Sequence, residues 1–337
     1  MKIGIDLGGT KTEIICLDHR QRELYRHREP SPQKNYQATL NLITRLITDT
    51  EAHFNERASI GIGIPGSLCR SKQIVKNCNS TWINGKPLKQ DLENRLNREI
   101  RIANDANCFA LSEAIKGVAV EAYSLFGVIL GTGCGGGLVI DKKVFLGANG
   151  LAGEWGHNPL PFPLIFNETH SIKAQSGDQP VSDIYRHKQV IRYQSAQPHH
   201  AEYPGPLCYC GKRGCIETWL SGPALVADYQ RVNQNPLVTE DKTAEHIVEA
   251  ALVGEQVAID CLNRYCERLA KSLAQIINII DPDMIVLGGG MSNIELLYTE
   301  VPKRWDKYIF SDTSTTPLLK ARHGDSSGVI GAALLWN

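Results

Sequence analysis

Three cysteines, Cys208, Cys210 and Cys215, lie close together in a segment that is punctuated by glycines. Three thiolates supply three ligands, whereas a structural zinc site takes four in a tetrahedral arrangement. We favour His157 as the fourth ligand, because it lies in the glycine-flanked segment 153–157 together with other reactive side chains. His199 and His200 are nearer in sequence but fall in an irregular segment. Free thiols without a metal are the alternative, since C-x-C spacing is less diagnostic than C-x-x-C.

Asp6 lies in the middle of an otherwise apolar run, residues 3–7, that predicts a buried strand. A buried carboxylate is costly unless it is paired or binds a metal, so a charge here is more often functional than not. Beside a nucleotide site, Mg²⁺ held through water would be the partner of Asp6. A hydrogen-bonded structural aspartate is the alternative.

Asp105 lies where a predicted strand at 100–103 turns into a predicted helix at about 106–116. It could act only as the helix N-cap. The helix-end amides and the macrodipole predict a lowered pKa for its carboxyl group. Phosphoryl transfer tolerates so weak a base, because the transition state is loose and the hydroxyl proton moves late. Asp105 is therefore our candidate general base.

Four glycine-rich loops, at 8–11, 63–66, 131–137 and 288–290, follow predicted strands. Glycine lets backbone N–H groups converge on a phosphate, although any one loop could be only a tight turn. Two loops match G-x-G-x-x-G, but that dinucleotide fingerprint requires a helix to begin at the loop. Residues 138–140 instead continue as a strand and Pro65 interrupts the other loop, while Walker spacing is absent. We expect phosphate to be held by paired hairpin turns, with the hydroxyls of Thr10 and Thr132 beside the glycines.

Apolar periodicity predicts the elements that position these residues. Strands are expected at 3–7, 13–17, 59–64, 100–103 and 284–287, and helical patterns at 38–54, 88–96, 106–116 and 243–280. Ser292 to Glu295 is expected to form a capping box that opens a further helix. Residues 126–131 repeat the apolar-glycine pattern of residues 3–8, which predicts a duplicated β-hairpin, one in each lobe.

Length and composition limit the class of protein. A chain of 337 residues predicts two domains. Lys+Arg 36 balances Asp+Glu 36, so there is no overall field for nucleic acid or an anionic membrane, and we expect neither as a partner. The chain enters a strand at once and has no apolar run near ~18 residues, which predicts a cytoplasmic protein. Its ten cysteines are then expected to be thiols or metal ligands, and the proline-rich residues 158–206 a surface insertion.

Together, the motifs at 6–11, 131–133, 153–157, 208–217 and 288–290 resemble the ROK family of sugar kinases and repressors. The resemblance runs from residue 3 to about residue 335. It implies an α/β fold of the actin-like (ribonuclease H-like) type, with two lobes around a cleft, ATP with Mg²⁺ as the phosphoryl donor, and commonly a homodimer. We divide the lobes as 1–120 and 121–337, the second carrying a structural Zn²⁺ knuckle and the 158–206 insertion.

The resemblance also implies residue roles. Asp105 is similar to the family's catalytic base. Residues similar to the sugar ligands are Gly66, Asn79, Asn104, Glu154, His157 and Glu217. Residues that would hold the nucleotide and its metal are Asp6, Gly8, Gly9, Thr10, Lys11, Gly131, Thr132, Gly133, Gly289 and Gly290. His157, Cys208, Cys210 and Cys215 match the zinc site. If His157 binds zinc through one ring nitrogen, we expect a sugar hydroxyl to satisfy the other.

Within the family, residues 76–85 and 157–161 are most similar to bacterial fructokinases, which implies phosphorylation of D-fructose to fructose 6-phosphate. A kinase for glucose, mannose or N-acetylglucosamine is the first alternative. A sugar-sensing regulator without catalysis is the second. The family's repressors carry a helix-turn-helix ahead of the kinase-like body, whereas here Met1 lies two residues before the first predicted strand, and Asp105 is retained.

Overall fold

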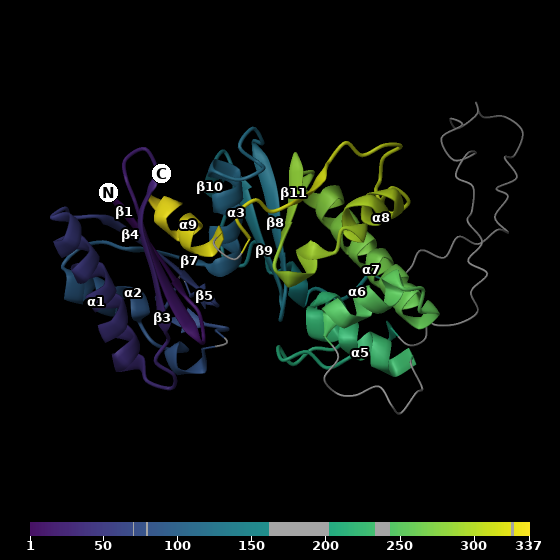
Figure 1. Cartoon of the computed structure of the whole chain (residues 1–337), viewed down its shortest axis with the longest axis horizontal. Coiled ribbons are helices and arrows are strands. Elements are labelled where there is room, and N and C mark those ends of the chain that lie inside the picture. The colour runs from purple at the N-terminus through teal and green to yellow at the C-terminus, as the bar shows by residue number, and fades with distance from the viewer. Residues whose placement is uncertain (70, 79, 162–201, 233–242, 325–326) are drawn as a thin grey trace, which may run out of the picture.

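The computed structural model describes residues 1–69, 71–78, 80–161, 202–232, 243–324 and 327–337. Most of the predicted insertion at 158–206 lies outside these residues. The chain forms two five-stranded sheets, in the orders β3-β2-β1-β4-β7 and β10-β9-β8-β11-β12, and a two-stranded sheet of β5 and β6 (Figure 1).

The first sheet contains β1 (Lys2–Leu7), β2 (Lys11–Leu17), β3 (Glu23–Pro30), β4 (Ser59–Ile64) and β7 (Arg101–Asn104). The second contains β8 (Ser124–Leu130), β9 (Cys134–Ile140), β10 (Lys143–Val144), β11 (Met284–Gly288) and β12 (Leu318–Lys320), and the small sheet β5 (Ser67–Leu68) and β6 (Val75–Lys76). The helices are α1 (Tyr36–Phe54), α2 (Leu88–Leu96), α3 (Asp105–Ile115), α4 (Glu217–Leu220), α5 (Gly222–Val232), α6 (Ala244–Leu252), α7 (Gln256–Ile280), α8 (Leu296–Trp305) and α9 (Ser327–Ala333).

The two large sheets have the same connectivity, which confirms the predicted duplication. β1 pairs antiparallel with β2 and parallel with β4, and β8 pairs antiparallel with β9 and parallel with β11. The outer strands follow the same rule, since β4–β7 and β11–β12 are parallel while β2–β3 and β9–β10 are antiparallel. The repeated sequence pattern at 3–8 and 126–131 therefore marks the central strand of each sheet.

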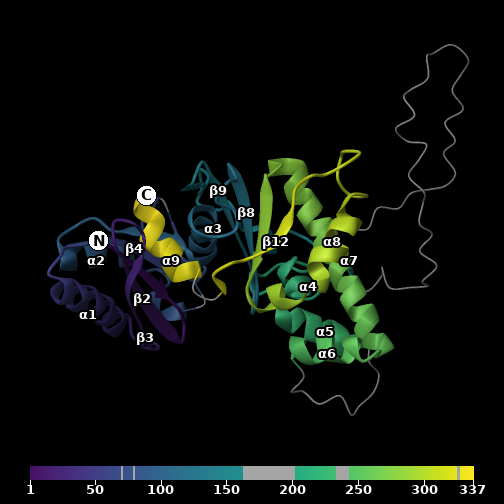
Figure 2. The same cartoon turned by 45° about the horizontal axis from the view of Figure 1, so that its top comes forward.

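Each large sheet is covered by the helix that follows the last strand of the other sheet. α3 follows β7 of the first sheet but packs on β8 and β9, whereas α9 follows β12 of the second sheet and packs on β1 and β4 (Figures 1 and 2). Each helix lies so close to a glycine of its sheet that a side chain there would clash. A Cβ on Gly4 would lie 2.2 Å from the carbonyl oxygen of Val329 in α9, and a Cβ on Gly127 would lie 2.8 Å from Ala110 Cβ in α3. This exchange joins the two halves, and the predicted lobe boundary at residue 120 remains a prediction.

Two local expectations change. The helical pattern at 243–280 divides into α6 and α7 around Gly254, whose φ of 92° suits glycine. The prediction of a capping box at 292–295 is wrong. Residues Gly290–Asn293 form a 3₁₀ helix, and the Ser292 hydroxyl donates to the carbonyl oxygen of Gly289 at 2.7 Å. α8 consequently begins at Leu296, and no side-chain hydrogen bond caps it.

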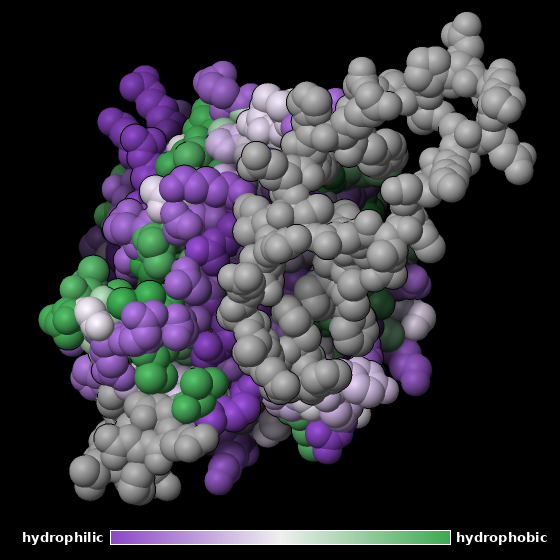
Figure 3. Space-filling model, turned by 90° about the vertical axis from the view of Figure 1, so that its right-hand side faces the viewer, coloured by the Kyte–Doolittle hydropathy of each residue, from purple (hydrophilic) through white to green (hydrophobic). Residues whose placement is uncertain are grey.

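The outer surface mixes hydrophilic and hydrophobic residues. Figure 3 views the molecule from the side of the second sheet, where the coloured residues show hydrophobic patches between hydrophilic ones. Within the described ranges, we find no helix that is both long and apolar enough to span a bilayer.

Candidate functional site

Asp105 directly follows strand β7 and is the first residue of α3. The N-cap is Asn104, whose Oδ1 accepts hydrogen bonds from the N–H groups of Ala106 at 2.8 Å and Asn107 at 3.3 Å. Asp105 is thus the first helical residue, and its own Oδ1 also accepts from Ala106 N–H at 2.7 Å. Because the capping task belongs to Asn104, the carboxylate of Asp105 is left for chemistry.

The environment raises the pKa of Asp105 to about 6. Loss of hydration is the largest cause and the negative charge of Glu154 adds to it, while the hydrogen bond from Ala106 acts in the opposite direction. The predicted lowering by the helix end is therefore wrong, because burial outweighs the amides. A carboxylate with this pKa is a stronger proton acceptor than an ordinary aspartate and is still mostly ionised at neutral pH.

Asp6 extends from β1 toward the same region. The pKa of Asp6 is raised to about 7: loss of hydration is the largest cause, the charges of Asp105 and Glu13 add to the rise, and Arg28 acts in the opposite direction. Glu13 already binds Arg28 through its Oε2 at 2.9 Å. A carboxylate that is disfavoured as an anion by burial and by neighbouring carboxylates suits a bound cation, so the donor chemistry at Asp6 is compatible with Mg²⁺.

Two cavities lie between parts of the chain that belong to different sheets. One, of about 180 Å³, is lined by Asn104, Asn107 and Glu154 among others. The other is a groove of about 1070 Å³ that is lined by Glu154, His157 and residues of the 77–84 loop. Glu154 lines both cavities and acts electrostatically on Asp105, so Asn104 and Glu154 lie near the candidate base, while His157 shares the groove with Glu154.

Three further predicted sugar ligands have different positions. Glu217 opens α4 and lies at the β8–β9 turn, where its Oε2 accepts the N–H of Cys134 at 3.0 Å. Gly66 packs tightly against Cys78, since a Cβ on Gly66 would lie 2.8 Å from Cys78 Cβ. Asn79 lies outside the described residues.

The glycine turns of the predicted nucleotide site fall into two groups. In the turn that contains Gly131, Thr132 and Gly133, the N–H of Gly131 donates to the carbonyl oxygen of Gly133 at 3.0 Å. Gly289 adjoins this turn with a φ of 79°, and a Cβ there would lie 2.5 Å from the carbonyl oxygen of Leu130. Gly290 follows in open space, where a Cβ would meet no other part of the chain within 4 Å.

The other group is the β1–β2 turn, residues 8–11, on the first sheet. The N–H of Gly8 donates to the carbonyl oxygen of Lys11 at 2.9 Å, and the Ser31 hydroxyl donates to the carbonyl oxygen of Gly8 at 2.7 Å. Thr10 and Lys11 are exposed, so their side chains are available to a ligand. Gly9 lies against Ser80, at the edge of the loop that lines the groove.

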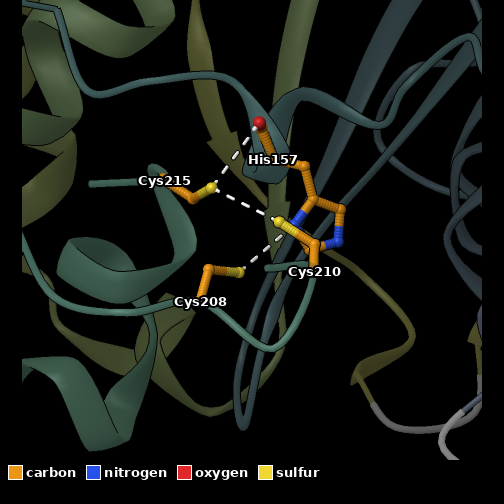
Figure 4. Close-up of side chains that lie close together, drawn as sticks. All are labelled: His157, Cys208, Cys210 and Cys215. Carbon is orange, nitrogen blue, oxygen red and sulfur yellow. Dashed lines mark hydrogen bonds between the residues drawn. The ribbon is translucent and has the colours of Figure 1, made fainter. Parts of the chain in front are cut away.

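The cysteine cluster assembles as predicted from distant segments. His157 comes from the 3₁₀ helix Trp155–His157, and its side chain points toward those of Cys208, Cys210 and Cys215 (Figure 4). The four ligand atoms lie within 4.8 Å of one another, with 3.6 Å between His157 Nδ1 and Cys208 Sγ and 3.7 Å between Cys210 Sγ and Cys215 Sγ. Metal–sulfur bonds of about 2.3 Å and a metal–nitrogen bond of about 2.0–2.1 Å give tetrahedral edges of about 3.5–3.8 Å. These residues therefore suit a four-coordinate metal ion.

The second ring nitrogen of His157 has a protein partner. His157 Nε2 lies 2.9 Å from the hydroxyl oxygen of Tyr209, and the two rings meet edge to face with centroids 5.1 Å apart. Tyr209 stands where we expected a sugar hydroxyl, and the sugar contact of His157 stays a prediction. Tyr209 carried no signal of its own in the sequence except its place between two predicted metal ligands.

Two duplicated α/β halves, a partly buried aspartate at the start of α3 and glycine turns on both sheets define a two-lobed sugar kinase of the actin-like fold. The chain belongs to the ROK family, whose model matches residues 2–337. It is similar to the N-acetyl-D-glucosamine kinase of Vibrio parahaemolyticus, with 37% identity over 99% of each chain. It is similar to that of Haemophilus influenzae too, with 35% identity over 100% of this chain and 99% of the other.

Solved structures agree on the fold. The ROK hexokinase of Thermus thermophilus has a TM-score of 0.78 and 26% identity, covering 99% of this chain and 97% of that one. A ROK family glucokinase of Streptomyces griseus, in complex with glucose and AMPPNP, has a TM-score of 0.71 and 25% identity, covering 98% and 97%. The expected actin-like fold is thereby confirmed, and the chain is an ATP-dependent hexose kinase of this family.

The expectation of a fructokinase is wrong. Relatives that match almost the whole chain at 35–37% identity are N-acetyl-D-glucosamine kinases. The expectation rested on two short segments, 76–85 and 157–161, which contribute side chains to the groove, whereas these relatives match over almost the whole chain.

Proposed function

We propose that the protein is an N-acetylglucosamine kinase, which transfers the γ-phosphoryl group of ATP to the 6-hydroxyl of N-acetyl-D-glucosamine. The observation that carries this proposal is the convergence of Asn104 and Glu154 at a cavity beside Asp105, in a chain whose full-length relatives bear that name. An aspartate that is mostly ionised at neutral pH, next to a cavity that Asn104 and Glu154 line, suits a sugar hydroxyl as its partner.

In the proposed mechanism, Asp105 accepts the proton of the sugar 6-hydroxyl. The oxygen forms a bond to the γ-phosphorus as the bond from that phosphorus to the ADP oxygen breaks, which leaves the 6-phosphate and ADP. Asn104 fixes the start of α3 and thus the position of the base, while Glu154 and Asn104 contribute polar groups to the cavity wall. Binding in this geometry supplies the alignment that an in-line transfer needs.

The nucleotide and the metal would lie on the other side of the base. The turns at 8–11 and 131–133, with Thr10, Lys11 and Thr132, would hold the phosphates, and Gly289 and Gly290 would face the adenosine. Asp6 would hold Mg²⁺ through water, and the ion neutralises phosphate charge when it is bound. Asp6 suits this role because burial disfavours the negative charge of its carboxylate, and a nearby cation would stabilise that charge.

We assign zinc to the four-residue cluster, where it would hold the 153–157 segment and therefore Glu154 against the 208–215 loop. We also propose a reducing, cytoplasmic location, in which the ten cysteines stay thiols or metal ligands. The expected homodimer remains a prediction that sedimentation velocity would test.

A panel of hexoses tests the proposed function. Turnover of N-acetylglucosamine, glucose, mannose and fructose is measured by coupled ADP release, and the product is identified by mass spectrometry. We expect N-acetylglucosamine to give the highest kcat/KM, by about tenfold or more, since a site that hydrogen-bonds a substituent rejects sugars without it.

Two outcomes would contradict this assignment. If glucose or mannose ranks first, the enzyme is another hexose kinase of the family. If sugar binds but none is phosphorylated with MgATP, the sugar-sensing regulator becomes the better explanation.

A further inference from the structure

Glu113 is a fully buried carboxylate in the last turn of α3, and it lines neither of the cavities described above. Its Oε2 accepts hydrogen bonds from the N–H groups of Val118 and Arg322, both at 3.1 Å. Its Oε1 accepts from the N–H of His323 at 3.3 Å and from the hydroxyl of Ser327 at 3.2 Å. These donors replace the hydration that burial removes, and they bind the approach to α9, and its first residue, to the end of α3.

The end of α3 is shaped around this carboxylate. A Cβ on Gly117 would lie 2.0 Å from Glu113 Oε2, so a residue with a side chain could not occupy this position without displacing the carboxylate. His323 adds a second contact, since its Nε2 lies 3.0 Å from the carbonyl oxygen of Lys116, the C-cap residue of α3. The start of α9 is therefore fixed relative to α3 by hydrogen bonds that converge on one buried group.

The start of α9 also lies directly against Asp6. A Cβ on Gly328, the second residue of α9, would lie 3.1 Å from Asp6 Oδ2, and a Cβ on Gly63 of β4 would lie 3.7 Å from Asp6 Oδ1. Two glycines thus border the carboxylate of Asp6, one from its own sheet and one from the helix that Glu113 holds. Neither glycine has a side chain that could absorb a movement of α9, so such a movement would act directly on the Asp6 carboxylate.

Further along, α9 packs on α3 without intervening side chains (Figures 1 and 2). A Cβ on Gly331 would lie 1.7 Å from the carbonyl oxygen of Cys108. A close contact at one point leaves a helix free to pivot about that point, whereas a second link fixes its direction. The hydrogen bond between Glu113 and Ser327 supplies the second link, at the end of α9 that borders Asp6.

We propose that Glu113 is a positioning residue for the magnesium site, which holds the start of α9 against Asp6 and thereby keeps the Asp6 carboxylate directed at the ion. The inference rests on the proposed function, in that it takes Asp6 to hold Mg²⁺ through water. It does not depend on which hexose is phosphorylated. Ser327 and Gly328 transmit the effect, so Glu113 needs no contact with a ligand of its own.

The first test is the variant Glu113→Gln in the full chain. The glutamine amide presents N–H donors where one carboxylate oxygen accepts, so it opposes part of the hydrogen bonding. With Mn²⁺ as the probe, in the presence of a non-hydrolysable ATP analogue, we expect about three- to tenfold weaker metal binding by electron paramagnetic resonance. Loss of a direct outer-shell partner of a metal ligand costs about 10–100-fold, and Glu113 acts at a greater distance.

Two further measurements separate this role from general instability. The Mg²⁺ concentration that gives half-maximal turnover should rise by the same factor as the Mn²⁺ dissociation constant. The dissociation constant of the hexose that the panel ranks first, measured by calorimetry without nucleotide, should stay within about twofold of the parent value, because Glu113 lies outside both cavities.

Ser327→Ala removes the link to α9 and leaves the three N–H donors on Glu113. We expect Mn²⁺ to bind about two- to fivefold more weakly, in the range of one neutral hydrogen bond. The double variant should bind Mn²⁺ within about twofold of Glu113→Gln alone, because both changes break the same link. This variant keeps the proposal testable if Glu113→Gln does not fold.

Glu51→Gln is the matched control, because Glu51 also fastens a helix to a neighbouring segment. Its Oε1 accepts the N–H of Ala58 at 2.6 Å, and its Oε2 accepts from Arg98 at 2.7 Å. This variant should lower the free energy of unfolding in urea but leave Mn²⁺ binding unchanged. Asp6→Asn, measured alongside, should weaken Mn²⁺ binding at least as much as Glu113→Gln.

Unchanged Mn²⁺ binding in Glu113→Gln and Ser327→Ala would overturn the proposal. Equal weakening in Glu51→Gln, or a parallel loss of sugar affinity in Glu113→Gln, would overturn it too, because the role would then be general stability. Failure of the magnesium assignment gives a different result, since Asp6→Asn itself would then bind Mn²⁺ like the parent. A different preferred hexose would change the proposed function but none of these Mn²⁺ values.

Discussion

The two halves of the molecule share one strand order but differ at the ends of their last strands. After β7, α3 begins with Asp105, whose neighbour Asn104 lines a cavity together with Glu154. After β12, a short connection leads to α9, which begins with Ser327, a buried residue whose hydroxyl donates to Glu113 Oε1 at 3.2 Å. The same scaffold position therefore carries a reactive group in one half and a packing contact in the other.

The central strands differ in the same way. Gly4 and Gly127 occupy equivalent positions and both allow a helix to approach the sheet, whereas Asp6 of β1 is replaced by Ile129 in β8. The shared residues are those that helix packing requires. Asp6, which we assign to Mg²⁺, is the residue of this pattern that has no acidic counterpart in β8.

The largest effect should come from Asp105→Asn, which removes the base from one half only. We expect kcat to fall by about 10²–10⁴-fold, the usual contribution of general-base catalysis, while sugar and ATP still bind. Steady-state kinetics and calorimetry measure the two quantities. Asp49→Asn on α1, an exposed aspartate, is the control and should leave kcat unchanged. Turnover of the Asp105 variant within tenfold of the parent would mean that another group is the base.

The pH profile sharpens this prediction. Because the pKa of Asp105 is raised to about 6, the carboxylate is protonated below that pH and can no longer accept the sugar proton. The value of kcat/KM should therefore fall about tenfold per pH unit below about pH 6. Activity that stays constant down to pH 5 would contradict the raised pKa.

The second largest effect concerns the two glycines. Gly4→Ala should destabilise the protein by about 1–3 kcal/mol and by more than Gly127→Ala. The added methyl group would meet the Val329 carbonyl oxygen at 2.2 Å in the first case, and the Ala110 side chain at 2.8 Å in the second. Urea unfolding measures both. Gly290→Ala, with open space around it, is the steric control, and equal destabilisation by all three would refute the packing argument.

The smallest effect on catalysis should come from the metal cluster, which the first half lacks within its described residues. Cys210→Ser should release zinc and raise KM for the sugar by about five- to tenfold, because the 153–157 segment that carries Glu154 loses its support. Chelation of the parent protein should give the same change. Cys69→Ser, outside the cluster, should keep its zinc. An unaltered KM after complete metal removal would separate the cluster from the sugar site.

Much of the scaffold could be predicted because its signals are local. The alternating residues 3–7 and 13–17 gave a hairpin, and the i,i+4 leucines and isoleucines of residues 38–54 gave α1, which the structure extends to Tyr36. The edge strand β3 was missed, since its residues are mostly exposed and show no apolar alternation. The capping box failed because Ser292 bonds to a nearer carbonyl group.

The residues of the candidate site could be named from the sequence, but the pKa values and hydrogen-bond partners of those residues could not. Residue types and spacing singled out Asp105 as the candidate base and predicted the four residues that the structure brings together in the cysteine cluster. The pKa of Asp105 depends on burial and on Glu154, which the fold brings from a distant segment. The partner of His157 Nε2 depends on how the 208–215 loop is folded, which no local pattern encodes.

The packing of α9 on β1 and β4 also constrains the order of events during synthesis. A Cβ on Gly61 of β4 would lie 1.9 Å from the carbonyl oxygen of Ala332, and the indole N–H of Trp336 donates to the carbonyl oxygen of Ile60 at 2.6 Å. The strands β1 and β4 thus obtain their covering helix from a segment that is synthesised long after them. The amino-terminal sheet cannot mature co-translationally by itself, and a nascent chain arrested before residue 327 should expose that face to chaperones.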